Sequence, residues 1–151
     1  MNPIMISTYF DILGKAQKIY ARHLEPVCRR WELTRSELDV LLFLYNNPQY
    51  NRATDIVSLR GMTKSHVSLS VTSLADRGLL NRQFSPTDRR TAYLALSDQG
   101  QAIAREARMH QEQFFEQLYT DVDQEDYLRM QEVMKRIRTN IENLDNSLTN
   151  T

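Results

Sequence analysis

Apolar side chains in residues 4–26 recur at the spacing of one helical face. The repeat consists of Tyr9, Leu13, Ala16, Tyr20 and Leu24. This spacing predicts a long helix at the start of the chain. Proline has no amide hydrogen and restricts the residue before it, so we expect the helix to end near Pro26.

A second helix is predicted in residues 34–47. Thr34 and Glu37 have the spacing of a capping box, in which each side chain accepts a hydrogen bond from a free backbone amide at the helix start. The run LDVLLFLYNN that follows is apolar on nearly all sides, which predicts central burial. The stretch NNP at residues 46–48 is expected to end the helix.

Two further helical segments are predicted in residues 52–78, on either side of a turn at 60–62. The first segment has three apolar residues to bury, which are Ile56, Val57 and Leu59. Thr63 is a suitable N-cap for the second segment, which runs to about Arg77. Gly78 then suits the left-handed backbone that follows many helices.

Alternating stretches at 80–84 and 91–96 flank Pro86 and predict a β-hairpin. Ser97 and Asp98 begin a long helix through roughly Tyr119, and a last helix runs from residues 121–123 toward Leu148. The expected fold is mainly α with a small β-wing. It has a winged helix-turn-helix core at 33–100, an N-terminal helix and connection at 1–32, and C-terminal helices at 101–151.

The helix that begins at Thr63 carries the candidate chemistry. Val67, Val71 and Leu74 form a narrow buried stripe, and small hydroxyl residues, including Ser73, dominate the other side. Such residues allow close approach to a groove and offer donors and acceptors to base edges and phosphates. We predict DNA contacts by Thr63, Lys64, Ser65, His66, Ser68, Leu69 and Thr72. An ordinary amphipathic surface helix with a polar outer side has the same pattern.

The turn of the hairpin carries Asp88, Arg89 and Arg90. Arginines at the end of a projecting hairpin suit the narrow minor groove, where the negative potential is enhanced. The Asp88 carboxylate is close enough in sequence to hold one guanidinium and stiffen the turn. We include all three residues in the predicted DNA interface. The alternative is a solvated turn with a weak surface ion pair.

Charge is distributed unevenly along a chain whose formal net charge is zero. Residues 52–93 contain seven Lys and Arg against three Asp, whereas residues 94–151 contain six basic and eleven acidic residues. This asymmetry indicates a localised contact with an anionic partner. A single cysteine suits a reducing cytoplasm. No apolar run approaches the roughly 20 residues of a membrane span, and no export signal is recognised, so we expect a cytoplasmic protein without membrane contact.

Three pieces of residues 33–100 occur in combination: the helix TKSHVSLSVTSLADRGLL, the D-x-R pattern of Asp88 and Arg90, and the strand-to-helix exit LALSDQG. The combination resembles the winged helix-turn-helix core of the MarR (multiple antibiotic resistance regulator) family. The resemblance implies a dimeric bacterial transcription regulator on a palindromic operator of double-stranded DNA. It also implies that the helix from Thr63 is the recognition helix and that Arg90, oriented by Asp88, enters the minor groove.

One position departs from that resemblance. Many members of the family carry an arginine where this chain has Leu69. A bidentate arginine contact with guanine is therefore unavailable here, and we expect a contact with a thymine methyl group instead.

The last helix carries an apolar repeat with alternating steps of three and four. Its members are Tyr127, Met130, Met134, Ile137, Ile141, Leu144 and Leu148. This is the a/d pattern of a coiled-coil contact, so we predict a homodimer through this helix, with Tyr9 and Leu13 in the same interface. Packing within one chain would produce a similar stripe. In the dimer, the two recognition helices would lie about 34 Å apart.

A small-molecule effector that changes this spacing would release or tighten the DNA, so we expect a repressor released by a small ligand. Candidate lining residues are Tyr9, Tyr20, His23 and Trp31, although aromatic residues at helical spacing are usually core. Cys28, expected beyond the first helix, is a candidate redox sensor if Arg29 and Arg30 lower its pKa. A buried, inert cysteine is the alternative.

Two other classes of function were compared. His23, His66 and His110 have no metal-ligand spacing, and the four glycines form no phosphate-binding loop, so we expect no enzyme, metal or cofactor. The second alternative is a winged-helix adaptor that contacts proteins and no DNA. It fits the zero net charge and the absence of an arginine at Leu69, whereas the basic middle of the chain disfavours it.

Overall fold

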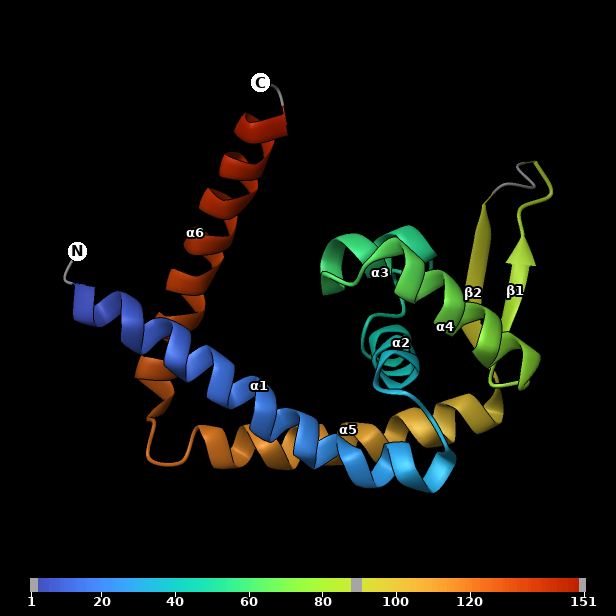
Figure 1. The fold of residues 1–151 in the computed structure, drawn as a ribbon, viewed down its shortest axis with the longest axis horizontal. Helices are drawn as coiled ribbons and strands as arrows, with labels where there is room; N and C mark the ends of the chain where they lie inside the picture. Colours follow the sequence, from blue (N-terminus) through green and yellow to red (C-terminus); the bar gives the residue numbers. More distant parts are fainter. Residues whose placement is uncertain (1–2, 88–90, 150–151) are drawn as a thin grey trace. The chain divides into compact units, whose positions relative to one another are not determined.

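The computed structural model describes residues 3–87 and 91–149 (Figure 1). In chain order its elements are α1 (Pro3–Trp31), α2 (Arg35–Asn46), α3 (Ala53–Arg60), α4 (Lys64–Asp76), β1 (Leu80–Phe84), β2 (Ala92–Leu96), α5 (Asp98–Leu118) and α6 (Gln124–Thr149). The predicted fold class, mainly α with a small β-wing, is confirmed. The chain forms two compact units, Met1–Phe115 and Glu116–Thr151.

The first helix continues beyond Pro26, so the predicted end was wrong. α1 runs without a break to Trp31 and therefore contains Cys28. An interior proline costs about 3 kcal/mol or more in an exposed helix because a backbone hydrogen bond is lost. Here Leu24 and Val27, on either side of the exposed Pro26, are fully buried. Their packing on the core offsets that cost and holds the helix together.

The capping box at the start of α2 is confirmed. The Glu37 amide donates to the Thr34 hydroxyl at 3.2 Å, and the Thr34 amide donates to the Glu37 carboxylate at 2.7 Å. The helix that follows is the centre of the first unit, with Leu38, Val40 and Leu41 fully buried. α2 packs against α1, α3, α4 and β2, which explains why apolar residues occur around its whole circumference.

The turn between α3 and α4 places Gly61 in the left-handed region, with φ of 72°, where a side chain would be strained. The Thr63 hydroxyl then accepts a hydrogen bond from the His66 amide at 3.2 Å and caps α4 as predicted. Ile56 of α3 is fully buried, but Leu59 is exposed, contrary to expectation. With eight residues, α3 has only a narrow side against the core, and Leu59 lies outside it.

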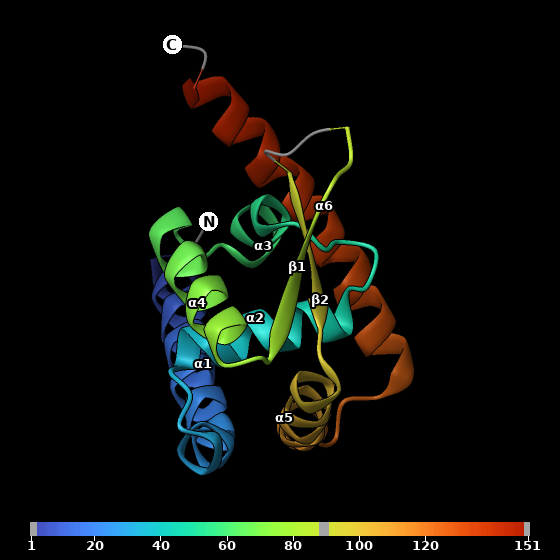
Figure 2. The same cartoon turned by 90° about the vertical axis from the view of Figure 1, so that its right-hand side faces the viewer.

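The wing is an antiparallel hairpin in which Leu80 pairs with Leu96 and Phe84 pairs with Ala92. Figure 2 shows β1 beside α4, and these two elements are in contact. A further pairing, which was not predicted, joins Arg52 to Tyr93 in an isolated antiparallel bridge. This bridge connects the hairpin to the segment that precedes α3. The predicted tip residues 88–90 lie outside the described residues.

α5 begins where the wing returns to the helical core. The Ser97 hydroxyl accepts a hydrogen bond from the Gly100 amide at 3.1 Å, as expected for an N-cap. Gly100 packs closely on the chain before β1, because a Cβ atom there would lie 2.0 Å from the carbonyl oxygen of Leu79. The wing is therefore attached to α5 through a contact that only glycine permits.

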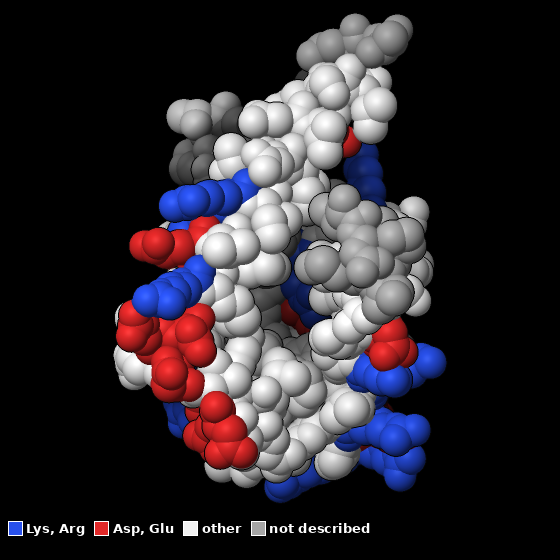
Figure 3. All heavy atoms as spheres, turned by 90° about the vertical axis from the view of Figure 1, so that its left-hand side faces the viewer, with Lys and Arg blue, Asp and Glu red and all other residues white. Residues whose placement is uncertain are grey.

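The second unit consists of the end of α5, a connection and α6. The Asp123 carboxylate accepts a hydrogen bond from the Asp126 amide at 2.8 Å and caps α6. The connection and first turn are acidic and exposed through Asp121, Asp123, Glu125 and Asp126. Figure 3 shows acidic side chains along the left side of the face that it draws, and basic side chains at its lower right. An acidic surface of this kind is unsuited to an anionic partner, which leaves the basic residues of the first unit as the candidate contact.

Candidate nucleic-acid interface

The two sides of α4 differ sharply in burial. Val67, Val71 and Leu74 are buried, as the apolar stripe predicted. The predicted contact residues on the other side are all exposed: Thr63, Lys64, Ser65, His66, Ser68, Leu69 and Thr72. Leu69 is 71% exposed although it is apolar. Packing among the described residues does not explain a leucine in this position, whereas contact with an external surface does.

Ser73 does not belong to the exposed side, contrary to the sequence prediction. Its hydroxyl is half-buried and donates a hydrogen bond to the Glu37 carboxylate of α2. Glu37 is only 6% exposed, and burial alone would raise its pKa. The hydrogen bonds from Ser73 and Thr34 outweigh burial and hold the pKa of Glu37 below its ordinary value. A buried carboxylate therefore fixes α4 against α2.

The C-terminal end of α4 is anchored to α1. The Arg77 guanidinium donates hydrogen bonds to the carbonyl oxygens of Trp31 at 2.7 Å and Glu32 at 2.9 Å. Glu32 has a left-handed backbone with φ of 51°, which turns its carbonyl out of the α1 helix. The sequence prediction missed this contact because Arg77 and Trp31 lie 46 residues apart.

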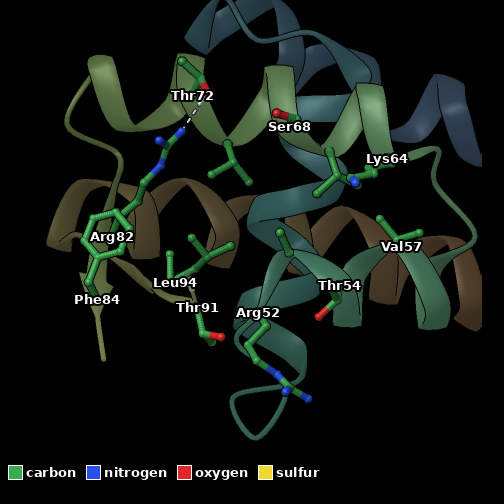
Figure 4. Close-up of a pocket in the computed structure, with 14 residues that line it drawn as sticks. Arg52, Thr54, Val57, Lys64, Ser68, Thr72, Arg82, Phe84, Thr91 and Leu94 are labelled. Carbon is green, nitrogen blue, oxygen red and sulfur yellow. Dashed lines mark hydrogen bonds between the residues drawn. The ribbon is translucent and has the colours of Figure 1, made fainter. Parts of the chain in front are cut away.

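A hollow of about 650 Å³ lies between α3, α4 and the wing (Figure 4). Its polar and charged lining comes from Arg52, Thr54, Lys64, Ser68, Thr72, Arg82 and Thr91. The Arg82 guanidinium of β1 donates a hydrogen bond to the Thr72 hydroxyl of α4 at 2.7 Å. The hollow thus adjoins the exposed side of α4, and the hydrogen bond between Arg82 and Thr72 connects β1 to α4 at one point of its lining.

The positive charges around the hollow differ in their partners. Arg52, in the lining, is paired with Asp55 of α3 at 3.1 Å, and Arg60, which ends α3 outside the lining, is paired with Asp39 at 3.2 Å. Lys64 and Arg82 have no carboxylate partner among the residues that the structure describes. These two side chains are the described cations best placed to bind an external anion.

Comparison with known proteins finds similarity to one family of regulators. Residues 31–91 match the MarR family model. A Bacillus subtilis (strain 168) protein described as an uncharacterized HTH-type transcriptional regulator is 24% identical over 113 residues, which are 75% of this chain and 68% of that protein. The chain is therefore similar to MarR-family proteins over its winged-helix core. The proteins that it resembles are described as transcription regulators.

Solved structures share the fold of this chain. A MarR-family regulator from Silicibacter pomeroyi matches with a TM-score of 0.75 and 14% identity, over 86% of this chain and 87% of that chain. A Bordetella bronchiseptica regulator, whose DNA binding is regulated by 6-hydroxynicotinic acid, matches with a TM-score of 0.67 and 18% identity, over 87% of this chain and 98% of that chain. At these identities the similarity shows the winged-helix architecture.

Three of the four predicted ligand-lining residues, Tyr20, His23 and Trp31, lie on α1 and contact α5, whereas Tyr9 is exposed. The ring of Phe114 is 5.2 Å from that of Tyr20 and 5.5 Å from that of His23, measured between centroids. The Trp31 indole donates to the Glu106 carboxylate at 2.9 Å. Burial raises the pKa of Tyr20, so its hydroxyl stays protonated. The three side chains pack on one helix, and a ligand role for them stays a prediction.

Cys28 has the environment of an unreactive thiol. It is half-buried in α1, and burial raises its pKa against the smaller opposing effect of Arg35. The redox hypothesis required Arg29 and Arg30 to lower this pKa, but Arg29 pairs with Glu25 and Arg30 pairs with Glu106. Within residues 3–87 and 91–149, no group of His, Cys, Asp and Glu is arranged to hold a metal ion.

The predicted dimer residues lie on surfaces that are apolar and exposed. Tyr9 and Leu13 of α1 are exposed, as are five residues of the α6 repeat, namely Met134, Ile137, Ile141, Leu144 and Leu148. Met130 is half-buried. A stripe of this length without a covering partner in its own unit is typical of an association surface. No helix in the described ranges has the combined length and hydropathy of a membrane span.

Proposed function

We propose that this chain is a dimeric repressor that binds a palindromic DNA operator and is released by a small ligand. One observation carries the proposal: the exposed half of α4 is built of short polar side chains and one exposed leucine, with a basic hollow and a β-hairpin directly beside it. Such a helix fits the major groove, which admits an α-helix and displays a distinct pattern for each base pair.

The rigid setting of α4 supports sequence-specific reading. Its N-terminus is capped by Thr63, its middle is bound to Glu37 through Ser73, and its end is anchored by Arg77. A recognition helix held at three points loses little conformational entropy on binding. Thr63, Lys64, Ser65, His66, Ser68 and Leu69 are the proposed contacts on α4. Asp88, Arg89 and Arg90 are proposed for the minor groove on sequence grounds.

Dimerisation follows from the apolar stripe of α6 together with the exposed residues of α1. One winged helix reads only a few base pairs, and two copies related by a twofold axis would read a palindrome with half-sites one helical turn apart. A ligand bound beside α1 and α5 would act by favouring one spacing of the two recognition helices. A regulator of this kind acts on chromosomal DNA in the cytoplasm.

The proposal is tested by selecting duplexes from a random pool with the purified chain and measuring affinity for the selected sequence over a range of salt. We expect a palindromic sequence with two half-sites. The logarithm of the affinity should fall by about 0.9 per phosphate contact for each tenfold rise in salt. A protein-binding adaptor would enrich no sequence and would bind no duplex even in dilute salt, which would refute the proposal.

A further inference from the structure

The hydrogen bond between Arg82 and Thr72 connects the wing to the recognition helix. It spans 2.7 Å from the Arg82 guanidinium to the Thr72 hydroxyl, and both side chains are exposed. Figure 4 shows Arg82 extending from β1 across one end of the hollow toward Thr72 on α4. The guanidinium therefore lies between the two elements that would enter neighbouring DNA grooves.

Arg82 and Thr72 mainly present hydrogen-bond donors to a ligand. The Thr72 oxygen already accepts a hydrogen bond from Arg82, so its own hydroxyl proton is left to donate. Arg82 has five N–H donors and no acceptor, and it has no carboxylate partner among the described residues. A fork of charged donors is the arrangement that binds phosphate oxygens most strongly.

The position of the pair indicates which part of DNA it meets. When a helix lies in the major groove and a hairpin lies in the adjacent minor groove, the sugar-phosphate strand between the grooves must cross the space between helix and hairpin. In this chain that space is the hollow between α4 and the wing. Lys64, Ser68 and Thr54 line the same hollow and offer further donors along it (Figure 4).

We propose that this hollow seats one sugar-phosphate strand of the duplex and that Arg82 binds its phosphate, with Thr72 as the residue that orients Arg82. This inference rests on the proposed DNA binding. It changes the role expected for Thr72 from a reader of bases to a positioning residue. It also assigns to β1 a contact that the sequence pattern of the wing does not reveal.

The first test compares Arg82→Gln with the unaltered chain on three duplexes: the selected operator, an operator with one altered half-site, and a random sequence. Loss of one charged phosphate contact should weaken binding about tenfold on all three. The salt slope should fall by about 0.9 per bound protomer. Lys15→Gln is the matched control, because it removes one exposed positive charge from α1, which contributes no residue to the lining of the hollow.

The second test uses Thr72→Val, which removes the hydroxyl and keeps the shape of the side chain. An Arg82 that has lost its anchor should bind less well, by about two- to fivefold, with the ranking of operator sequences unchanged. In the double variant with Arg82→Gln, the valine should cause no further loss, because both residues act through one contact.

Three results would overturn the inference. Arg82→Gln could bind like the unaltered chain, the loss of affinity in Arg82→Gln could be confined to the operator, or Thr72→Val could change the preferred sequence in the Arg82→Gln background.

Thermal unfolding followed by circular dichroism checks that each variant folds. Arg82→Lys provides a second variant that should keep the salt slope and lose part of the affinity. If the unaltered chain binds no duplex, the proposed function fails. If it binds and Arg82→Gln binds equally well, only this inference fails.

Discussion

The hydroxyl of Ser73 on α4 donates a hydrogen bond to the carboxylate of Glu37 on α2. The same carboxylate accepts a hydrogen bond from the Thr34 amide at the start of α2, so one buried group both completes a helix cap and fixes α4 against α2. Because hydrogen bonds to the ionised form hold the pKa of Glu37 below its ordinary value, the arrangement favours the folded state only when Glu37 is charged.

Stability should therefore fall in acid. A carboxyl group with a lowered folded-state pKa contributes its full stabilisation above its unfolded pKa and loses it as the pH falls through the folded value. We expect Ser73→Ala to reduce the free energy of unfolding by about 1 kcal/mol at pH 7, with a smaller difference in acid. Urea unfolding at a series of pH values measures both. Ser68→Ala deletes the same atoms from the exposed side of α4 and should change stability by less than about 0.5 kcal/mol. If Ser73→Ala and Ser68→Ala changed the free energy of unfolding equally, a stabilising role for the hydrogen bond between Ser73 and Glu37 would be contradicted.

Gly100 should tolerate no side chain. A Cβ atom there would lie 2.0 Å from the Leu79 carbonyl oxygen, so Gly100→Ala forces backbone movement where the wing joins α5. We expect a loss of about 1–3 kcal/mol, measured by thermal unfolding. Gly14→Ala provides the control, because nothing lies within 4 Å of its added Cβ and alanine favours a helix. Gly14→Ala should be neutral or slightly stabilising. If Gly100→Ala were no more destabilising than Gly14→Ala, the close contact between Gly100 and Leu79 would be contradicted.

Leu69 should influence which operator is preferred. Its side chain is 71% exposed on α4, where a methyl-rich surface suits the C5 methyl group of thymine. We expect Leu69→Ala to lose about 1 kcal/mol of discrimination for a thymine at one position, with nearly unchanged affinity for random duplex. Repeating the pool selection with the variant measures this. An identical selected sequence would remove Leu69 from the readout.

The apolar stripe of α6 should hold two copies together. Ile141→Asp places a charge among Ile137, Leu144 and their counterparts, and we expect the variant to sediment as a monomer at micromolar concentration. Asn143→Asp adds the same charge to the exposed polar side of the helix and should leave the assembly unchanged. A dimer that survives Ile141→Asp would show that α6 is not the interface.

Cys28 should play no part in redox sensing. Burial raises its pKa, which keeps the thiol protonated at neutral pH, and the thiolate is the reactive form. Treatment with hydrogen peroxide should leave the DNA affinity of the chain equal to that of Cys28→Ser under the same conditions. A loss of affinity on oxidation that Cys28→Ser abolishes would prove the opposite.

Local signals in the sequence predicted the fold well. The capping box of Thr34 and Glu37, the N-cap of Thr63 and the alternating strands of the wing are each determined by residues a few positions apart, so their elements could be placed without tertiary information. The stripe of Val67, Val71 and Leu74 also predicted correctly which side of α4 faces the core.

The errors and omissions involve residues that are distant in the sequence. Pro26 is a helix breaker in isolation, and only the burial of Leu24 and Val27 shows why α1 continues past it. Ser73 and Arg82 carry no periodic signal, because their roles depend on partners on other elements of the fold. The same holds for Arg77, whose acceptors are backbone carbonyls that no sequence pattern can mark.

The separation of buried, structural residues from exposed residues on α4 has a consequence for how such a regulator could acquire new DNA targets. The residues that hold the helix are concentrated on its buried side and at its last turn, whereas Ser65, Ser68 and Leu69 are exposed on its outer side. Exchanging those side chains should leave folding almost untouched. A few point changes at the outer surface would therefore suffice to redirect the protein to a different promoter while its scaffold is inherited intact.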